Sequence, residues 1–130
     1  MSIHALLLGL SAFLACSLSQ AAEQSQIESV SLIRLIANPD QYEGKFVRVT
    51  GFVRLEFEGN AIYLHREDFE KQIPANGLWL NAGKCAGRGG KDFTEGYAIV
   101  EGRYTSKRHG HMGLWSGEID DVQRCEQWWR

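Results

Sequence analysis

Residues 47–58 alternate between apolar and polar side chains, and this alternation constrains the fold more than any other feature of the chain. The apolar positions are Val47, Val49, Val53, Leu55 and Phe57, and the polar ones are Arg48, Thr50, Arg54, Glu56 and Glu58. Because successive side chains of a strand point to opposite faces, the pattern predicts one long strand whose odd-numbered side chains are buried. Gly51 falls midway on that buried face, where a glycine lets a strand bend sharply or coil around a small barrel.

Four further segments have the composition of strands and are separated by polar or glycine-rich connections. They are residues 61–65, 78–80, 97–104 and 114–122. Gly102 lies on the inward face of its strand, as Gly51 does, and Ile119 and Val122 are the expected core residues of the last strand. Five strands, two of them bent at glycine, fit a closed barrel because closure leaves no strand edge exposed. We therefore predict a mainly β fold, a small five-stranded OB-like barrel.

A short helix is predicted ahead of the first strand, at residues 32–37. Ser31 can cap its N-terminus, and Pro39 ends it because proline disfavours helical geometry in the residue before it. In a typical OB domain the helix lies between the third and fourth strands. Here the corresponding segment, residues 81–96, is rich in glycine and is predicted to be a long loop.

Residues 1–22 contain no Lys, Arg, Asp or Glu, and residues 5–18 are almost continuously apolar. The apolar run is shorter than the roughly 20 residues that a membrane-spanning helix needs, and small residues follow it. These features predict a secretory signal peptide that is cleaved after Ala21 or Ala22, although the basic residue usual near its start is missing. We expect a bacterial protein of the periplasm or a secreted one, whose mature form, residues 23–130, is a single domain with no transmembrane helix.

Two alternatives to this cleavage remain open. The leader can stay uncleaved as an N-terminal anchor. Cys16 can instead be the lipid attachment site of a membrane-anchored lipoprotein, since the small Ala15 precedes it, but Phe13 and Leu14 depart from the usual pattern of such a site. We favour the interpretation that Cys16 is an apolar residue of the discarded segment.

Removal of the leader leaves two cysteines, Cys85 and Cys125. In an oxidising compartment two cysteines favour a disulfide, which we predict here. Closing a loop of this length adds about 4 kcal/mol to the free energy of unfolding in the chain-entropy model. The alternatives are two separate thiols or a bond to a partner protein.

His109-Gly110-His111 is the most suggestive local motif. Two histidines separated by one residue can share a metal ion in an extended segment, and His65 can be a third ligand if the barrel brings it near. The motif lacks the spacing signature of a zinc site, so we favour a glycine-flanked turn and predict no metal or other cofactor. A metal-dependent or hydrolytic enzyme that uses His109 and His111 is the alternative function.

Aromatic side chains offer a second candidate surface. Phe46, Phe52, Tyr63 and Trp79 can form a stacking platform of the kind that OB domains use for nucleic acid, although core packing is the ordinary role of such rings. The formal net charge is −2, and the protein is expected outside the cytoplasm, so nucleic acid is not the expected partner. The candidate binding residues are therefore Tyr63, Trp79, His109, His111 and Trp115.

Catalytic residues are not recognisable in the sequence. Ser106 and Ser116 lie near the histidines but in no nucleophile motif, and oxidised cysteines are not nucleophiles. Glu56 and Glu58 share the outward face of the predicted strand, where solvated carboxylates are ordinary. We therefore expect a non-enzymatic periplasmic binding or accessory module whose partner is an envelope protein or a small ligand.

Several segments resemble a family of small, uncharacterised bacterial exported proteins with an OB-like barrel. They are residues 31–39, 42–51, 56–64 and 110–117, which together span most of the mature chain. The family has no established activity to carry over. The stretch from Tyr42 to Gly51 alone is also similar to the first strand of many OB-type domains, including the periplasmic haem chaperone of cytochrome c maturation, and no haem-binding residue is transferred from it.

Overall fold

The computed structural model describes residues 26–128, so the predicted signal peptide and Cys16 lie outside the described residues. The helices are α1 (Leu32–Ala37), α2 (Pro39–Tyr42) and α3 (Arg66–Glu70), with 3₁₀ turns at Pro74–Asn76, Arg88–Gly90 and His111–Gly113. The strands are β1 (Glu28–Ser29), β2 (Phe46–Arg54), β3 (Ala61–Tyr63), β4 (Gly77–Leu80), β5 (Cys85–Ala86), β6 (Asp92–Phe93), β7 (Glu95–Thr105) and β8 (Glu118–Gln127).

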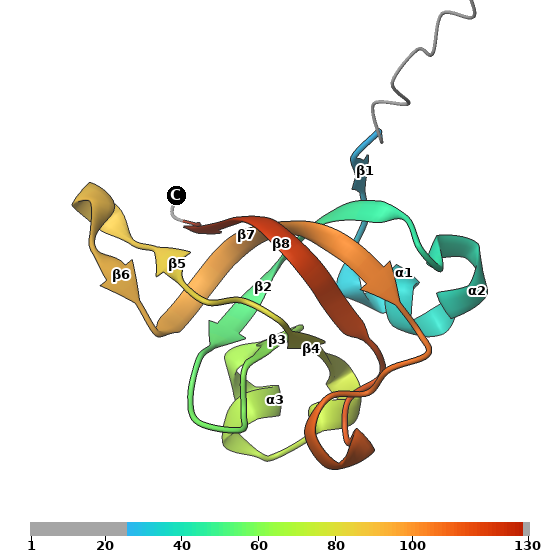
Figure 1. Cartoon of the computed structure of the whole chain (residues 1–130). Helices are drawn as coiled ribbons and strands as arrows, with labels where there is room; N and C mark the ends of the chain where they lie inside the picture. The colour runs from blue at the N-terminus through green and yellow to red at the C-terminus, as the bar shows by residue number, and fades with distance from the viewer. Residues whose placement is uncertain (1–25, 129–130) are drawn as a thin grey trace, which may run out of the picture.

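Five of these strands close the predicted OB-like barrel. β2 pairs with β3, and β3 with β4, in antiparallel fashion, and β4 then pairs in parallel with β8. β8 is antiparallel to β7, which returns to β2 and completes the cycle. Figure 1 shows β7 and β8 as the two long strands that cross the barrel, with α1 and α2 at one end and α3 beside β3 and β4.

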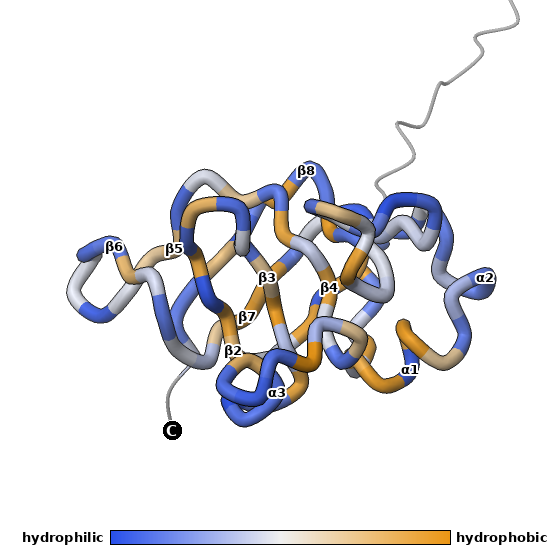
Figure 2. The backbone as a smooth tube through the Cα atoms, turned by 90° about the horizontal axis from the view of Figure 1, so that it is seen from below, coloured by the Kyte–Doolittle hydropathy of each residue, from blue (hydrophilic) through white to orange (hydrophobic). Residues whose placement is uncertain are grey.

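The odd-numbered face of β2 is buried, as the alternation predicts. Val47 and Val53 are completely buried, and Val49 is 1% exposed. Gly51 serves a close approach as well as a bend, since a Cβ atom there would lie 2.5 Å from the Tyr63 carbonyl oxygen and 2.8 Å from Leu32 Cδ1. Figure 2 shows hydrophobic residues along the barrel strands and α1, and hydrophilic ones along α2 and the loops.

The first strand ends earlier than predicted. β2 stops at Arg54, and the Asn60 side chain accepts a hydrogen bond from the Glu56 backbone at 3.0 Å, which holds residues 55–60 in a turn. The prediction that Phe57 is buried is wrong, because this turn leaves the side chain 92% exposed. Phe52 differs in the opposite sense, since it lies on the outward face of β2 and is nevertheless fully buried.

The last strand starts later than predicted, at Glu118 instead of Leu114. Residues 106–117 form a loop that contains Gly110, Met112 and Gly113, all with positive φ. Three residues with positive φ in so short a segment are incompatible with a strand. Ile119 is fully buried, as expected, and Val122 packs against the core at its edge.

The N-terminal helix forms where the capping pattern places it. Ser31 is the N-cap of α1, and its hydroxyl accepts a hydrogen bond from the Arg34 backbone at 3.3 Å. Leu32 and Leu35 turn into the core and are almost completely buried. Within residues 26–128 no helix has the length and apolar character required to cross a membrane.

The predicted disulfide joins Cys85 and Cys125, whose Cα atoms are 4.7 Å apart. It lies where β5 runs parallel to β8, and both sulfur-bearing residues are buried. The segment from residue 81 to 96 is therefore more ordered than a plain loop. β5 and β6 form a small hairpin that projects from the barrel in Figure 1, and the disulfide attaches its base to β8.

Candidate functional site

A second, smaller layer of aromatic side chains covers the outer face of the barrel. Phe52, Ala61, Tyr63 and Trp115 form its buried part, and Phe69 of α3 and Trp79 of β4 pack against them. The rings of Trp79 and Trp115 meet edge to face with their centroids 5.0 Å apart. The predicted aromatic platform is thus partly assembled, but α3 and residues 106–117 cover much of it.

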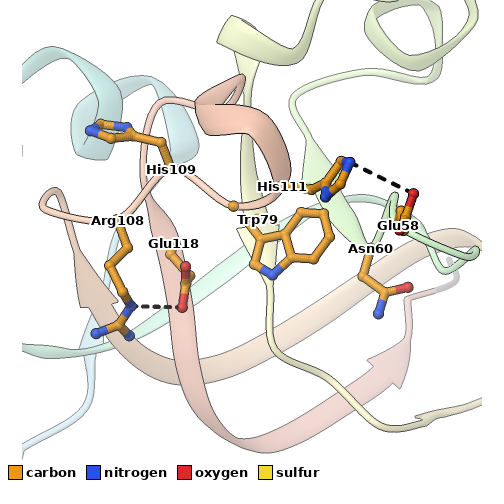
Figure 3. A pocket seen from close by; sticks show the side chains of 8 residues that line it. Glu58, Asn60, Trp79, Arg108, His109, His111 and Glu118 are labelled. Atoms are coloured by element: carbon orange, nitrogen blue, oxygen red, sulfur yellow. Dashed lines mark hydrogen bonds and ion pairs between the residues drawn. The ribbon is translucent and has the colours of Figure 1, made fainter.

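An open cleft of about 620 Å³ lies between the two loops that flank this face, and we call it the Trp79 cleft. We name residues 55–60 the β2–β3 loop and residues 106–117 the β7–β8 loop. The side chains around the cleft are those of Glu58, Asn60, Trp79, Arg108, His109, His111 and Glu118 (Figure 3). Three of the five candidate binding residues, Trp79, His109 and His111, therefore contribute to its lining.

Gly110 allows the β7–β8 loop to lie directly on Trp79. Its φ is +65°, and a Cβ atom would come within 2.6 Å of the indole carbons. Two hydrogen bonds between His109 and Trp115 hold the loop closed, one from the Trp115 backbone N–H to the His109 carbonyl at 3.2 Å and one between His109 Nδ1 and the Trp115 carbonyl at 2.9 Å. The backbone conformation at Gly110 and the hydrogen bonds of His109 thus fix this wall of the cleft.

The base of the β7–β8 loop is held by Glu43, which follows α2. Its carboxylate accepts hydrogen bonds from Thr105 Oγ1 at 2.8 Å, from the Ser106 backbone at 2.6 Å and from Ser106 Oγ at 2.7 Å. The bonds from Ser106 hold the pKa of Glu43 below its usual range. The loop start is therefore tied to α2 whenever this carboxyl group is ionised.

The two histidines do not converge on a common point. His111 lies beside Trp79, and its Nε2 faces Glu58 Oε2 at 3.6 Å, whereas the His109 imidazole points away from Trp79 and His111 (Figure 3). His65 is the N-cap of α3 and does not line the cleft. In the described part of the chain, no three His, Cys, Asp or Glu side chains are grouped so as to hold a metal ion.

Polar partners fix the other side of the cleft. The Arg108 guanidinium donates to Glu118 Oε1 at 3.0 Å and to Asp120 at 2.5 Å. Trp79 Nε1 donates to Asn81 Oδ1 at 3.0 Å, and the Asn81 amide in turn donates to Glu118. This chain of hydrogen bonds orients the indole and Glu118 before any ligand arrives.

The two serines that the sequence offered as nucleophiles form hydrogen bonds with other groups. Ser106 Oγ donates to Glu43, and Ser116 Oγ donates to the Ala75 carbonyl at 2.6 Å. Neither hydroxyl is paired with His109 or His111, so the described residues do not form a serine–histidine pair at the cleft.

Sequence reasoning missed Asn60, Arg108 and Glu118 as residues of the site, and it placed Glu58 on a solvated strand face. Asn60 carried a usable signal because it follows a glycine at a predicted turn. Arg108 and Glu118 carried none, since they meet only through the folding of the β7–β8 loop. Tyr63 and Trp115 line a different cleft, which is described below.

Comparison with known proteins identifies no relative of the chain. No family model, curated protein or solved structure matches the chain significantly. The resemblance to small exported bacterial proteins accordingly stays a prediction, and the function has to be argued from the site itself.

Proposed function

We propose that this protein is a non-enzymatic binding module of the bacterial periplasm and that it holds its ligand in the Trp79 cleft. The observation that carries the proposal is the position of the cleft. A half-buried indole lies between the two loops that flank the outer face of an OB-like barrel, and this is the face on which OB barrels bind oligosaccharides and oligonucleotides. The hypothesis depends on export by the predicted leader at residues 1–22.

The chemistry around the cleft favours a neutral oligosaccharide. The indole offers an apolar surface on which a sugar ring can stack, and Glu58, Asn60 and His111 present hydrogen-bonding groups at its edge. The only lining guanidinium, that of Arg108, is engaged by two carboxylates. Cationic side chains are what bind a phosphate backbone, so a polyanion such as nucleic acid is disfavoured here.

Titration of the purified protein with oligomers of N-acetylglucosamine, glucose and maltose, followed by tryptophan fluorescence and by the melting temperature, tests the proposal. We expect saturable binding of one series, with affinity that falls up to about tenfold in Trp79→Phe, because the smaller ring keeps only part of a stacking contact that is worth about 1–3 kcal/mol per base, by alanine substitution, in nucleic-acid sites. Glu67→Gln, on the exposed side of α3, is the matched control and should bind as the wild type does. Absence of saturable binding up to millimolar sugar, or unchanged binding in Trp79→Phe, would overturn it.

Export is tested separately by intact-mass analysis of protein recovered from the bacterial envelope. We expect a chain that starts at residue 22 or 23 and whose mass shows one disulfide. A chain that begins with a lipid-modified Cys16 would show that the protein is a lipoprotein. An intact leader would contradict the export hypothesis.

A further inference from the structure

A second cleft, of about 670 Å³, lies between α3 and the β7–β8 loop and shares no lining residue with the Trp79 cleft. We call it the Phe69 cleft. Its walls are built mainly from Tyr63, Phe69, Leu114 and Trp115, with Glu56 and Glu70 at its edge. The cleft thus combines three aromatic rings with two carboxylates, a combination that the proposed sugar binding does not use.

The aromatic cluster that forms this cleft already binds cations within the protein. The Arg54 guanidinium lies 5.2 Å from the centre of the Phe69 ring, and that of Arg66 lies 4.7 Å from the centre of Phe52. Ring faces attract guanidinium and ammonium groups through their negative electrostatic potential. Tyr63 and Phe69, with ring centres 5.9 Å apart, therefore offer a surface suited to a further positive group.

The ionised groups that line the Phe69 cleft are carboxylates, and the Arg54 guanidinium lies nearby over the Phe69 ring. No Lys, Arg or His is among its lining residues. Glu56 is paired with Arg54 at 3.2 Å, whereas Glu70 forms no ion pair with any residue between 26 and 128. An incoming cation therefore meets two carboxylates, of which Glu56 is already paired with Arg54 and Glu70 is not.

Trp115 adds a hydrogen-bond donor to the wall. The residue is 7% exposed, and its Nε1 makes no hydrogen bond of normal geometry to a described residue. Burial raises the pKa of the neighbouring Tyr63 hydroxyl, and the Trp115 N–H offsets part of that rise, so the two groups are close without being well paired. This N–H is completely covered by protein atoms, so a carbonyl oxygen brought by a ligand reaches it only if the Trp115 indole turns toward the cleft.

We propose that the Phe69 cleft binds a lysine or arginine side chain presented by a peptide. The apolar stem lies against Leu114 and Phe69, the charged head reaches Glu70, and a peptide carbonyl oxygen accepts from Trp115 Nε1. A polyamine has the same cationic head but no carbonyl oxygen, and a neutral aliphatic side chain has the stem without the charge. The proposal does not depend on the ligand of the Trp79 cleft.

Titration of the ¹⁵N-labelled full chain with the blocked peptide Ac-Ala-Ala-Lys-Ala-Ala-NH₂ tests this binding directly. We expect saturable shifts of the Trp115 indole N–H signal, which Trp115→Phe assigns by removing it, and of the backbone signals of α3. The same peptide with norleucine in place of lysine should bind at least tenfold more weakly, and spermidine at least threefold more weakly. Equal binding of the norleucine peptide would overturn the cationic head, and equal binding of spermidine would overturn the peptide carbonyl.

A pair of charge variants separates a site from general attraction to an acidic surface. Glu70→Gln removes the uncompensated carboxylate of the cleft, and Glu67→Gln removes an equal charge from the same helix outside the cleft. We expect Glu70→Gln to weaken binding of the lysine peptide about fivefold and Glu67→Gln less than twofold. Equal losses in the two variants, or no saturable binding by the wild type at millimolar peptide, would overturn the proposal.

Discussion

Gly110 lies on the indole of Trp79 so closely that a single added methyl group would overlap the ring, with its carbon 2.6 Å from Trp79 Cγ and Cδ2. The same residue has a φ of +65°, which side chains other than glycine rarely adopt. Two independent constraints therefore fix this position as glycine. Through it the β7–β8 loop takes its place above β4, and the Trp79 cleft depends on that contact.

Gly110→Ala should lower the free energy of unfolding by about 3 kcal/mol, because its φ of +65° and ψ of −159° lie in a region almost closed to residues with a Cβ atom and because the added methyl group overpacks against the ring. Gly113→Ala is the matched control, because its φ is +70° and nothing lies within 4 Å of an added Cβ atom. It should lose only about 1 kcal/mol. Urea unfolding followed by tryptophan fluorescence measures both values. Equal losses would show that the contact with Trp79 contributes nothing.

The disulfide should stabilise the domain by about 4 kcal/mol in the chain-entropy model, since Cys85 and Cys125 are 40 residues apart in sequence. The double variant Cys85→Ala and Cys125→Ala should unfold at a correspondingly lower urea concentration. Relative to the wild type, its amide-proton exchange should accelerate more in β5 and β6 than in β2. A double variant whose stability equals that of the wild type would contradict a stabilising role for this bond.

The barrel could be predicted because its signals are local. Alternation along residues 47–53 and the Ser31 cap each depend on neighbours a few positions away, and both were found in the structure. The disulfide could be predicted by counting the cysteines that remain after removal of the predicted signal peptide. These features need no knowledge of which distant segments meet.

The parts that could not be predicted depend on contacts between distant segments. β2 ends at Arg54 because the Asn60 side chain binds the Glu56 backbone, which hydrophobic periodicity does not record. Phe52 is buried on the outward face because Phe69 of α3 and Tyr97 of β7 pack against its ring. The Trp79 cleft also depends on a contact between distant segments. His111 and Glu58 meet in space, but their loops are far apart in the sequence.

Glu43→Gln should loosen the base of the β7–β8 loop. The folded-state pKa of Glu43 is depressed below 4.5, so its contribution is present above that pH and is lost as the pH falls through the folded pKa. We expect the wild type to exceed the variant by about 1 kcal/mol at pH 7, and the difference to shrink steadily below pH 4.5. Urea unfolding at several pH values checks this, and a difference that does not change with pH would rule out the ionised carboxylate as its source.

Tyr42→Phe should leave the stability unchanged or raise it by up to about 1 kcal/mol, because the Tyr42 hydroxyl is buried without a hydrogen-bond partner among the described residues. Tyr104→Phe is the natural comparison. The Tyr104 hydroxyl is equally buried but donates to the Leu35 carbonyl at 3.4 Å, so its removal should lower stability slightly. Thermal unfolding of the two variants gives the order, and a destabilised Tyr42→Phe would reveal an unseen partner for that hydroxyl.

Tyr104 should also limit stability in alkali. Burial, assisted by the charges of Glu43 and Asp40, raises the pKa of Tyr104 from 10.0 to about 12. The unfolded chain ionises this phenol near pH 10 while the folded chain does not, so the stabilisation is complete below pH 10 and is lost as the pH rises through 12. We expect the wild type to lose up to about 2 kcal/mol more than Tyr104→Phe between these limits. Tyr97→Phe, which removes a partly exposed hydroxyl, should lose as much unfolding free energy in alkali as the wild type does. If its loss were as small as that of Tyr104→Phe, the assignment to Tyr104 would be wrong.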